Sequence, residues 1–222
     1  MGPGPGVKGY ASGGPTTFEI RALDTGTGTT SAECSMSINS GETLVVSAAA
    51  ETQTPANVSI SSSPTLTWTQ AAVNSANLGG STKIWTAEAS ITGTLTATVA
   101  ATGSGASSCV LYAIAGSETT LGGASATNGS DIQASPSVSI TTTRADSLIF
   151  AVTSDWNAIT GTETYRTPPT HTERLDDYTN PSQYRGYHYT APATTAGSYT
   201  IGMTAPTGQG SNTAVIEIRK PE

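Results

Sequence analysis

The sequence predicts an all-β protein: a two-sheet antiparallel β-sandwich of the jelly-roll kind. Short strand-like segments recur about every ten residues and are separated by Gly, Pro, Asn and Ser. Only 11% of the residues are charged, and Ser, Thr, Ala and Gly take their place, which is typical of strands with hydroxyl-rich outer faces. The order of the strand signals also repeats after about 104 residues.

The expected strands fall into two sets. The first set lies near 17–22, 32–38, 43–49, 57–61, 66–71, 82–89, 94–101 and 107–115, and the second near 137–142, 147–153, 169–174, 184–190, 198–204 and 213–219. Alternating apolar residues predict which side of each strand faces the core. The predicted inward rows match between the sets: Leu44, Val46 and Ala48 with Leu148, Phe150 and Val152, and Cys109, Leu111 and Ala113 with Ala214, Ile216 and Ile218.

Two architectures fit this repeat. "IWTAEASITGTLTATVA" at 84–100 aligns without gaps to "HYTAPATTAGSYTIGMT" at 188–204, and the half-repeats cover about 32–116 and 137–220. One architecture is a single sandwich over 17–222 with halves related by a pseudo-two-fold axis, and the other is two tandem immunoglobulin-like sandwiches. We favour the first, because "CVLYAIA" at 109–115 is apolar on both faces, as expected of a strand covered on both sides.

Residues 1–16 form a Gly- and Pro-rich N-terminal arm with little to bury. Val7 and Tyr10 offer the apolar surface of this arm, so we expect them to be its contacts with another subunit. The formal net charge of −7 disfavours nucleic acid and anionic membrane surfaces as partners. The opening residues show no signal-peptide pattern, and no apolar run approaches the ~18 residues of a membrane span.

Cys34 and Cys109 each fall within an expected strand. They are interpreted either as two buried free thiols or as one disulfide, and the thiols are preferred because no secretion signal is seen. Their spacing does not resemble a zinc site, and we expect no metal and no cofactor.

The window 154–190 is rich in aromatic residues and arginine, which mark contact surfaces because they bury much area at low entropic cost. Its aromatic side chains are candidates for a surface or glycan contact. The competing interpretation is that these tyrosines cover the open end of the sandwich. The candidate contact residues are Trp156, Tyr165, Tyr178, Tyr184, Tyr187 and Tyr189.

The same window gives no catalytic site. His171 and Glu173 would share one face of a strand, but Asp176 and Asp177 are adjacent and would point to opposite sides, so neither a metal site nor an acid–base pair is predicted. G-x-S-x-G, H-E-x-x-H and P-loop motifs are absent from the sequence. We therefore expect a non-enzymatic protein.

Several segments together resemble a loose group of β-sandwich domains from structural proteins of tailed bacteriophages and from bacterial surface proteins. They are "SGETLVVSAAAE", "LTWTQ", "SSCVLYAIAG" and "SPSVSITTTRADSLIFAV". The resemblance implies a virion structural protein, assembled in the host cytoplasm and displayed as a head decoration or minor tail protein. Its implied partners are capsid or tail subunits, or further copies of itself, reached through the N-terminal arm. The alternative is a carbohydrate-binding or adhesion module that contacts a host-surface glycan through the loops of 154–190.

Overall fold

The structure is a computed structural model that describes residues 18–75, 80–118, 123–130, 135–156, 163–180 and 184–222, the side chains of 130 and 177–180 excepted. Within these residues it contains sixteen strands and one short 3-10 turn at Pro55–Asn57. None of the described segments forms a helix of the length and apolarity that a membrane span requires.

The strands of the first half pair into two antiparallel sheets, a five-stranded one in the order β1-β8-β3-β6-β5 and a three-stranded one in the order β2-β7-β4. Their bounds are β1 (Glu19–Gly28), β2 (Ser31–Ile38), β3 (Thr43–Ala50), β4 (Val58–Ser63), β5 (Thr69–Asn74), β6 (Ser81–Glu88), β7 (Gly93–Ala101) and β8 (Ser107–Ala115).

The second half forms a five-stranded sheet in the order β13-β14-β11-β16-β9 and a three-stranded sheet in the order β10-β15-β12. Its strands are β9 (Ser125–Ser130), β10 (Ser137–Thr142), β11 (Ser147–Asp155), β12 (Thr164–Tyr165), β13 (Thr172–Asn180), β14 (Tyr184–Ala193), β15 (Gly197–Ala205) and β16 (Ser211–Ile218). The predicted all-β antiparallel sandwich is therefore confirmed. Each half supplies both sheets of its own sandwich. This is the pairing of the tandem alternative and not that of the single sandwich that we favoured.

Both sandwiches have the same order of strands when each strand of the first is matched to the strand eight further along. Gly93 opens β7 and Gly197 opens β15, 104 residues later, with φ angles of +153° and +152° that favour glycine. The match is between the orders of the strands and not between the residues. The repeat in the amino-acid sequence therefore stays a prediction.

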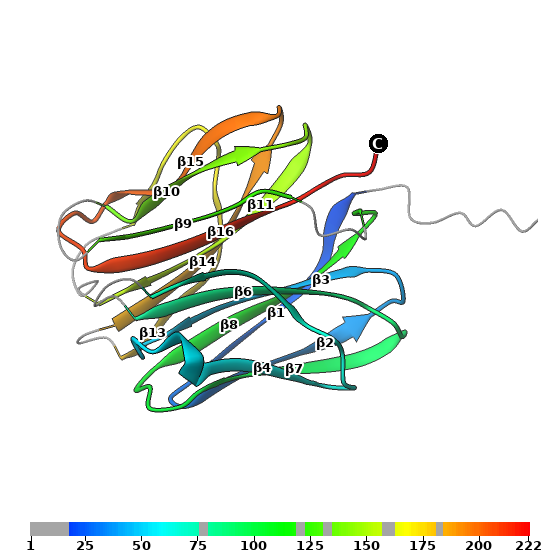
Figure 1. Cartoon of the computed structure of the whole chain (residues 1–222), viewed down its shortest axis with the longest axis horizontal. Helices are drawn as coiled ribbons and strands as arrows, with labels where there is room; N and C mark the ends of the chain where they lie inside the picture. The colour runs from blue at the N-terminus through cyan, green and yellow to red at the C-terminus, as the bar shows by residue number, and fades with distance from the viewer. Residues whose placement is uncertain (1–17, 76–79, 119–122, 131–134, 157–162, 181–183) are drawn as a thin grey trace, which may run out of the picture.

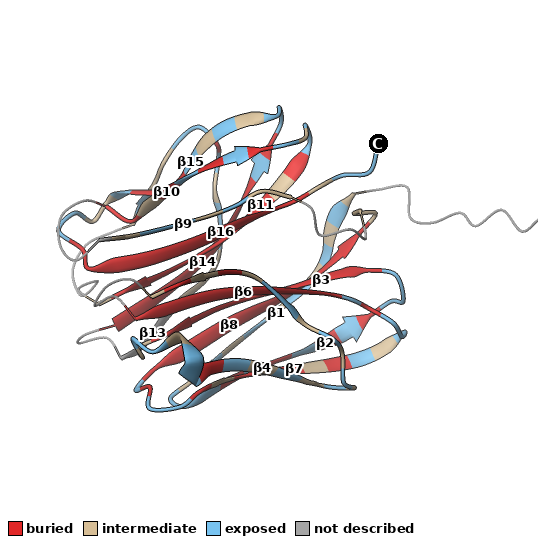
Figure 2. Ribbon diagram, in the orientation of Figure 1, coloured by how far each residue is buried: buried red, intermediate tan, exposed pale blue. Residues whose placement is uncertain are grey.

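The two five-stranded sheets pack face to face, so the four sheets form a stack of layers (Figure 1). Strand β3 contacts β11 near the middle, while β1 contacts β13 and β5 contacts β9 near the edges. The middle strands of the inner sheets are buried on both faces, whereas the edge strand β1 alternates between exposed and half-buried residues (Figure 2). Three apolar cores result: a first outer core, a central core between the five-stranded sheets, and a second outer core.

Strand β8 shows how an inner strand serves two cores. Cys109 and Leu111 face the first outer core, whereas Val110 and Tyr112 face the central core. All four side chains are fully buried. The prediction that "CVLYAIA" is covered on both faces is confirmed.

The predicted correspondence of inward rows is wrong by one residue. Val46 lies in the first outer core, but Phe150 and Val152 lie in the central core. The strand-equivalent residues that face the second outer core are Ile149 and Ala151. Alternation could not distinguish the two sides, because β3 and β11 are apolar on both faces.

The outer faces of the two three-stranded sheets are lined by hydroxyl groups. Ser35 of β2 hydrogen-bonds Thr96 of β7 at 2.9 Å, and Ser139 of β10 lies opposite Thr200 of β15 at 3.4 Å. These cross-strand pairs stand on exposed faces and satisfy one another. The sheets therefore present a polar surface while their other faces close the outer cores.

Candidate functional site

A cluster of ionisable side chains in the second sandwich is formed by Glu163, Glu173, Asp176 and Arg185, which we call the acid–arginine cluster. Oxygen atoms of the three carboxylates lie within 4.8 Å of one another. Glu163 directly precedes β12, the acids Glu173 and Asp176 lie on β13, and Arg185 lies on β14. The cluster thus joins the two sheets of the second sandwich.

A bulge in β13 brings two of the acids to one side. Glu173 lies opposite Tyr189 and Asp176 opposite Tyr187, with a register shift between Glu173 and Leu175. Residues three apart in a regular strand point to opposite faces, and an extra residue restores them to the same face. Both residues therefore lie on the face of β13 that Tyr187 and Tyr189 share on β14, which neither residue spacing nor alternation predicted.

Arg185 is the counter-charge of the cluster. Its guanidinium pairs with both Glu163 and Asp176, and 4% of its side chain is exposed. It also lies over the ring of Tyr187, 4.8 Å from the ring centre. Burial by itself lowers the pKa of Arg185, but the hydrogen bonds and charge of Asp176, with Glu163, outweigh burial and raise it. Arg185 therefore links Glu163 and Asp176 through two buried ion pairs.

Arg185→Lys is expected to lower the free energy of unfolding by about 2 kcal/mol, because an ammonium cannot hold two carboxylates in the forked geometry of a guanidinium. Urea denaturation at neutral pH measures this. Arg21→Lys is the matched control, since Arg21 pairs with Glu42 at a more exposed position and should lose about 1 kcal/mol or less. Equal losses in the two variants would contradict a larger contribution to stability from the ion pairs of Arg185 than from the pair of Arg21 with Glu42.

Tyr165 and His171 stack beside this cluster. Their rings are 5.5 Å apart and nearly parallel, and Tyr189 packs against both. The Tyr165 hydroxyl donates to Glu173 at 3.0 Å. His171 Nε2 accepts from the Gly202 amide at 3.2 Å, so Nδ1 carries the proton and donates to the Arg166 carbonyl at 2.8 Å. Burial lowers the pKa of His171, and the ring is a neutral structural element.

His188 lies on the opposite face of β14, in the central layer between the five-stranded sheets. Its Nδ1 is 2.8 Å from the Ser47 hydroxyl, and its Nε2 is 2.9 Å from the Ser108 hydroxyl. The side chain is fully buried, which lowers the pKa of His188 to about 3. A serine beside a histidine suggests a nucleophile, but this pair lies where substrate has no access.

The structure corrects three of the predicted contact residues. Tyr184, Tyr187 and Tyr189 are 1%, 0% and 0% exposed, so they are not surface contacts. They belong to β14, an inner strand whose two faces are both covered. Tyr184 packs into the central core, and the other two pack into the second outer core.

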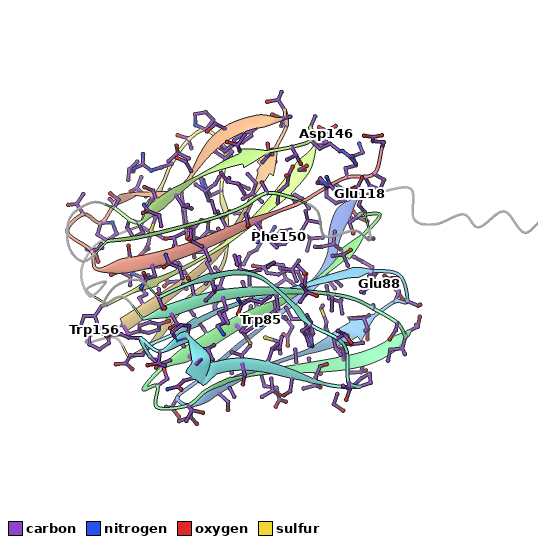
Figure 3. The ribbon with its side chains drawn as sticks, in the orientation of Figure 1. Trp85, Glu88, Glu118, Asp146, Phe150 and Trp156 are labelled. Carbon is purple, nitrogen blue, oxygen red and sulfur yellow. The ribbon has the colours of Figure 1, made fainter. Side chains whose placement is uncertain are left out.

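The remaining predicted contacts differ in what can be said of them. Trp156 directly follows β11 and is half-buried at one end of the molecule (Figure 3). Its amide donates to the Gly210 carbonyl at 2.9 Å. Tyr165 is also half-buried. The side chain of Tyr178 and the residues Val7 and Tyr10 lie outside the described part of the chain.

A second polar site lies at the other end of the molecule, in a cavity of about 510 Å³ beside Glu42. The Glu42 carboxylate accepts hydrogen bonds from Arg21 and from the Asn39 amide, at 2.7 Å each. Burial raises the pKa of Glu42, but these bonds outweigh it and hold the pKa below its usual value. The carboxylate is thus a fixed anion that ties β1 to the turn before β3.

The geometry defines a protein of two stacked β-sandwiches whose described ionisable clusters are tied into the framework. Comparison with known proteins adds no relative: no family model, no curated protein and no solved structure matches the chain. Glu163 is the residue that sequence reasoning missed, since it comes from outside β13 and only the fold brings it to Glu173.

Proposed function

We propose that this chain is a non-enzymatic structural protein displayed on the surface of a larger assembly. The observation that carries the proposal is the four-layer stack with hydroxyl-lined outer faces. Its central core joins the two sandwiches through packed apolar side chains, so both can serve as one stiff body. The polar clusters that could have served catalysis are held in fixed ion pairs or buried between sheets.

The assembly that we propose is a tailed-bacteriophage virion, with the chain as a head decoration or minor tail protein. The sequence resemblance supports the assignment to a virion. A stiff stack with polar outer faces is also suited to display on the surface of a particle. We propose the arm of residues 1–16 as the attachment, with Val7 and Tyr10 as its apolar contacts.

Immunogold electron microscopy tests the proposal. Antibodies against the purified protein are applied to intact particles from cells that produce it. We expect regular labelling of the particle surface, and a Val7→Ala/Tyr10→Ala double variant should reduce it several-fold. Recovery of the wild-type protein wholly outside the particle fraction would overturn the proposal.

A carbohydrate-binding module is the second candidate, because Trp156 and Tyr165 are both half-exposed. Three of the six contact residues proposed for this function are buried in the cores. Binding on a glycan array that Trp156→Ala abolishes would favour it over the structural role.

A further inference from the structure

Two cysteines face each other across the first sandwich. Cys34 lies on β2 of the three-stranded sheet, opposite Ala97 of β7. Cys109 lies on β8 of the five-stranded sheet, opposite Ala48 of β3. Both side chains point into the first outer core and are 1% and 0% exposed. Their Sγ atoms are in contact, 2.6 Å apart, and the structure has both as free thiols.

We propose that Cys34 and Cys109 form a disulfide that joins the two sheets of the first sandwich when the chain folds in the presence of a small-molecule disulfide oxidant. The bond would join residues 75 apart in the sequence. Both cysteines stand inside hydrogen-bonded ladders, so their positions are set by the sheets. The sheets already place the sulfur atoms 2.6 Å apart, close to the bond length of about 2.05 Å in a disulfide.

The chemistry is thiol–disulfide exchange in two steps. One cysteine loses its proton and attacks a sulfur of the oxidant, forming a mixed disulfide and releasing one small thiol. The second cysteine loses its proton and attacks the mixed disulfide, forming the protein disulfide and releasing the second small thiol. Two protein thiols are oxidised, and one small-molecule disulfide is reduced to two thiols.

Burial sets when this exchange can occur. The hydrogen bond with Cys34 and then burial raise the pKa of the Cys109 thiol, so the reactive thiolate is scarce in the folded chain. The oxidant also has no path to a fully covered side chain. We therefore expect the disulfide to form during folding and, once formed, to resist reductants that act on the native protein.

Refolding in defined redox buffers tests the proposal. The full chain is unfolded in urea with reductant, then refolded with either reduced or oxidised glutathione. Thiols are next counted by maleimide labelling in denaturant with intact-mass detection. We expect two labelled cysteines after refolding with reduced glutathione and none after refolding with oxidised glutathione. The oxidised monomer should be lighter than the reduced monomer by two hydrogen atoms. The oxidised protein should melt roughly 10 °C higher, because the cross-link restricts the unfolded chain.

A Cys34→Ala/Cys109→Ala variant is the matched control, and its melting temperature should be the same in both buffers. If that variant does not fold, the thiol count on the wild-type chain still decides the question. Two free thiols after refolding with excess oxidised glutathione would overturn the proposal. So would a disulfide found only between chains, as dimers on a non-reducing gel.

Discussion

Phe150→Ala is expected to lower the free energy of unfolding by about 4 kcal/mol. The ring is fully buried in the central core, between the two five-stranded sheets (Figure 3). It meets Tyr112 of the opposite sheet edge-on, with ring centres 4.9 Å apart. Truncation removes buried apolar area and leaves a cavity that two rigid sheets cannot close. Equilibrium urea denaturation measures the loss.

Phe150→Leu is the control, because it keeps most of the apolar volume and should cost about 1.5 kcal/mol or less. Hydrogen exchange locates the effect. The protection of backbone amides should decrease in β8 as well as in β11, because the ring contacts Tyr112 of β8 in the other sandwich. A loss below 1 kcal/mol for Phe150→Ala, or a change confined to the second sandwich, would contradict a shared central core.

How far the sequence predicts the fold depends on how each strand is covered. Strand β2 alternates strictly between exposed and buried residues, so its inward face could be predicted from the pattern alone. Strand β3 is buried at every position, and its pattern cannot say whether Val45 or Val46 faces the neighbouring sandwich. Most of the strands were predictable, but β9 and β12 were not expected. The stacking of the two sandwiches was not predictable either, because it depends on which apolar face meets which.

The candidate site shows a second limit. The window 154–190 holds an unusual concentration of polar and aromatic groups, but the role of each group depends on long-range placement. Tyr187 and Tyr189 are core residues because β14 is an inner strand. Asp176 reaches Glu173 only through the bulge in β13. A bulge and a buried arginine leave no regular spacing in the sequence.

Acidification is expected to destabilise the protein through His188, at a higher pH than the range in which the carboxylates of the protein titrate. Burial lowers the pKa of His188 to about 3 in the folded chain, whereas an unfolded histidine has a pKa of roughly 6.5. Between these values the unfolded chain binds a proton that the folded chain does not, so stability falls as pH falls. The free energy of unfolding should drop by roughly 2 kcal/mol from pH 7 to pH 5, and by about 3 kcal/mol at pH 4.

His188→Gln removes this titration and should flatten the profile between pH 7 and pH 5 by most of that amount, although the variant starts less stable at pH 7. His171→Gln separates the two histidines, because burial also lowers the pKa of His171 and its contribution has the same sign. The pKa values of Glu42 and Glu217 are held low in the folded chain. Their contribution to the free energy of unfolding is therefore lost only at lower pH, where carboxylates of the unfolded chain begin to bind protons. The comparison is therefore made above pH 5 by urea denaturation. A His188→Gln profile as steep as that of the wild-type chain would show that the proton binds elsewhere.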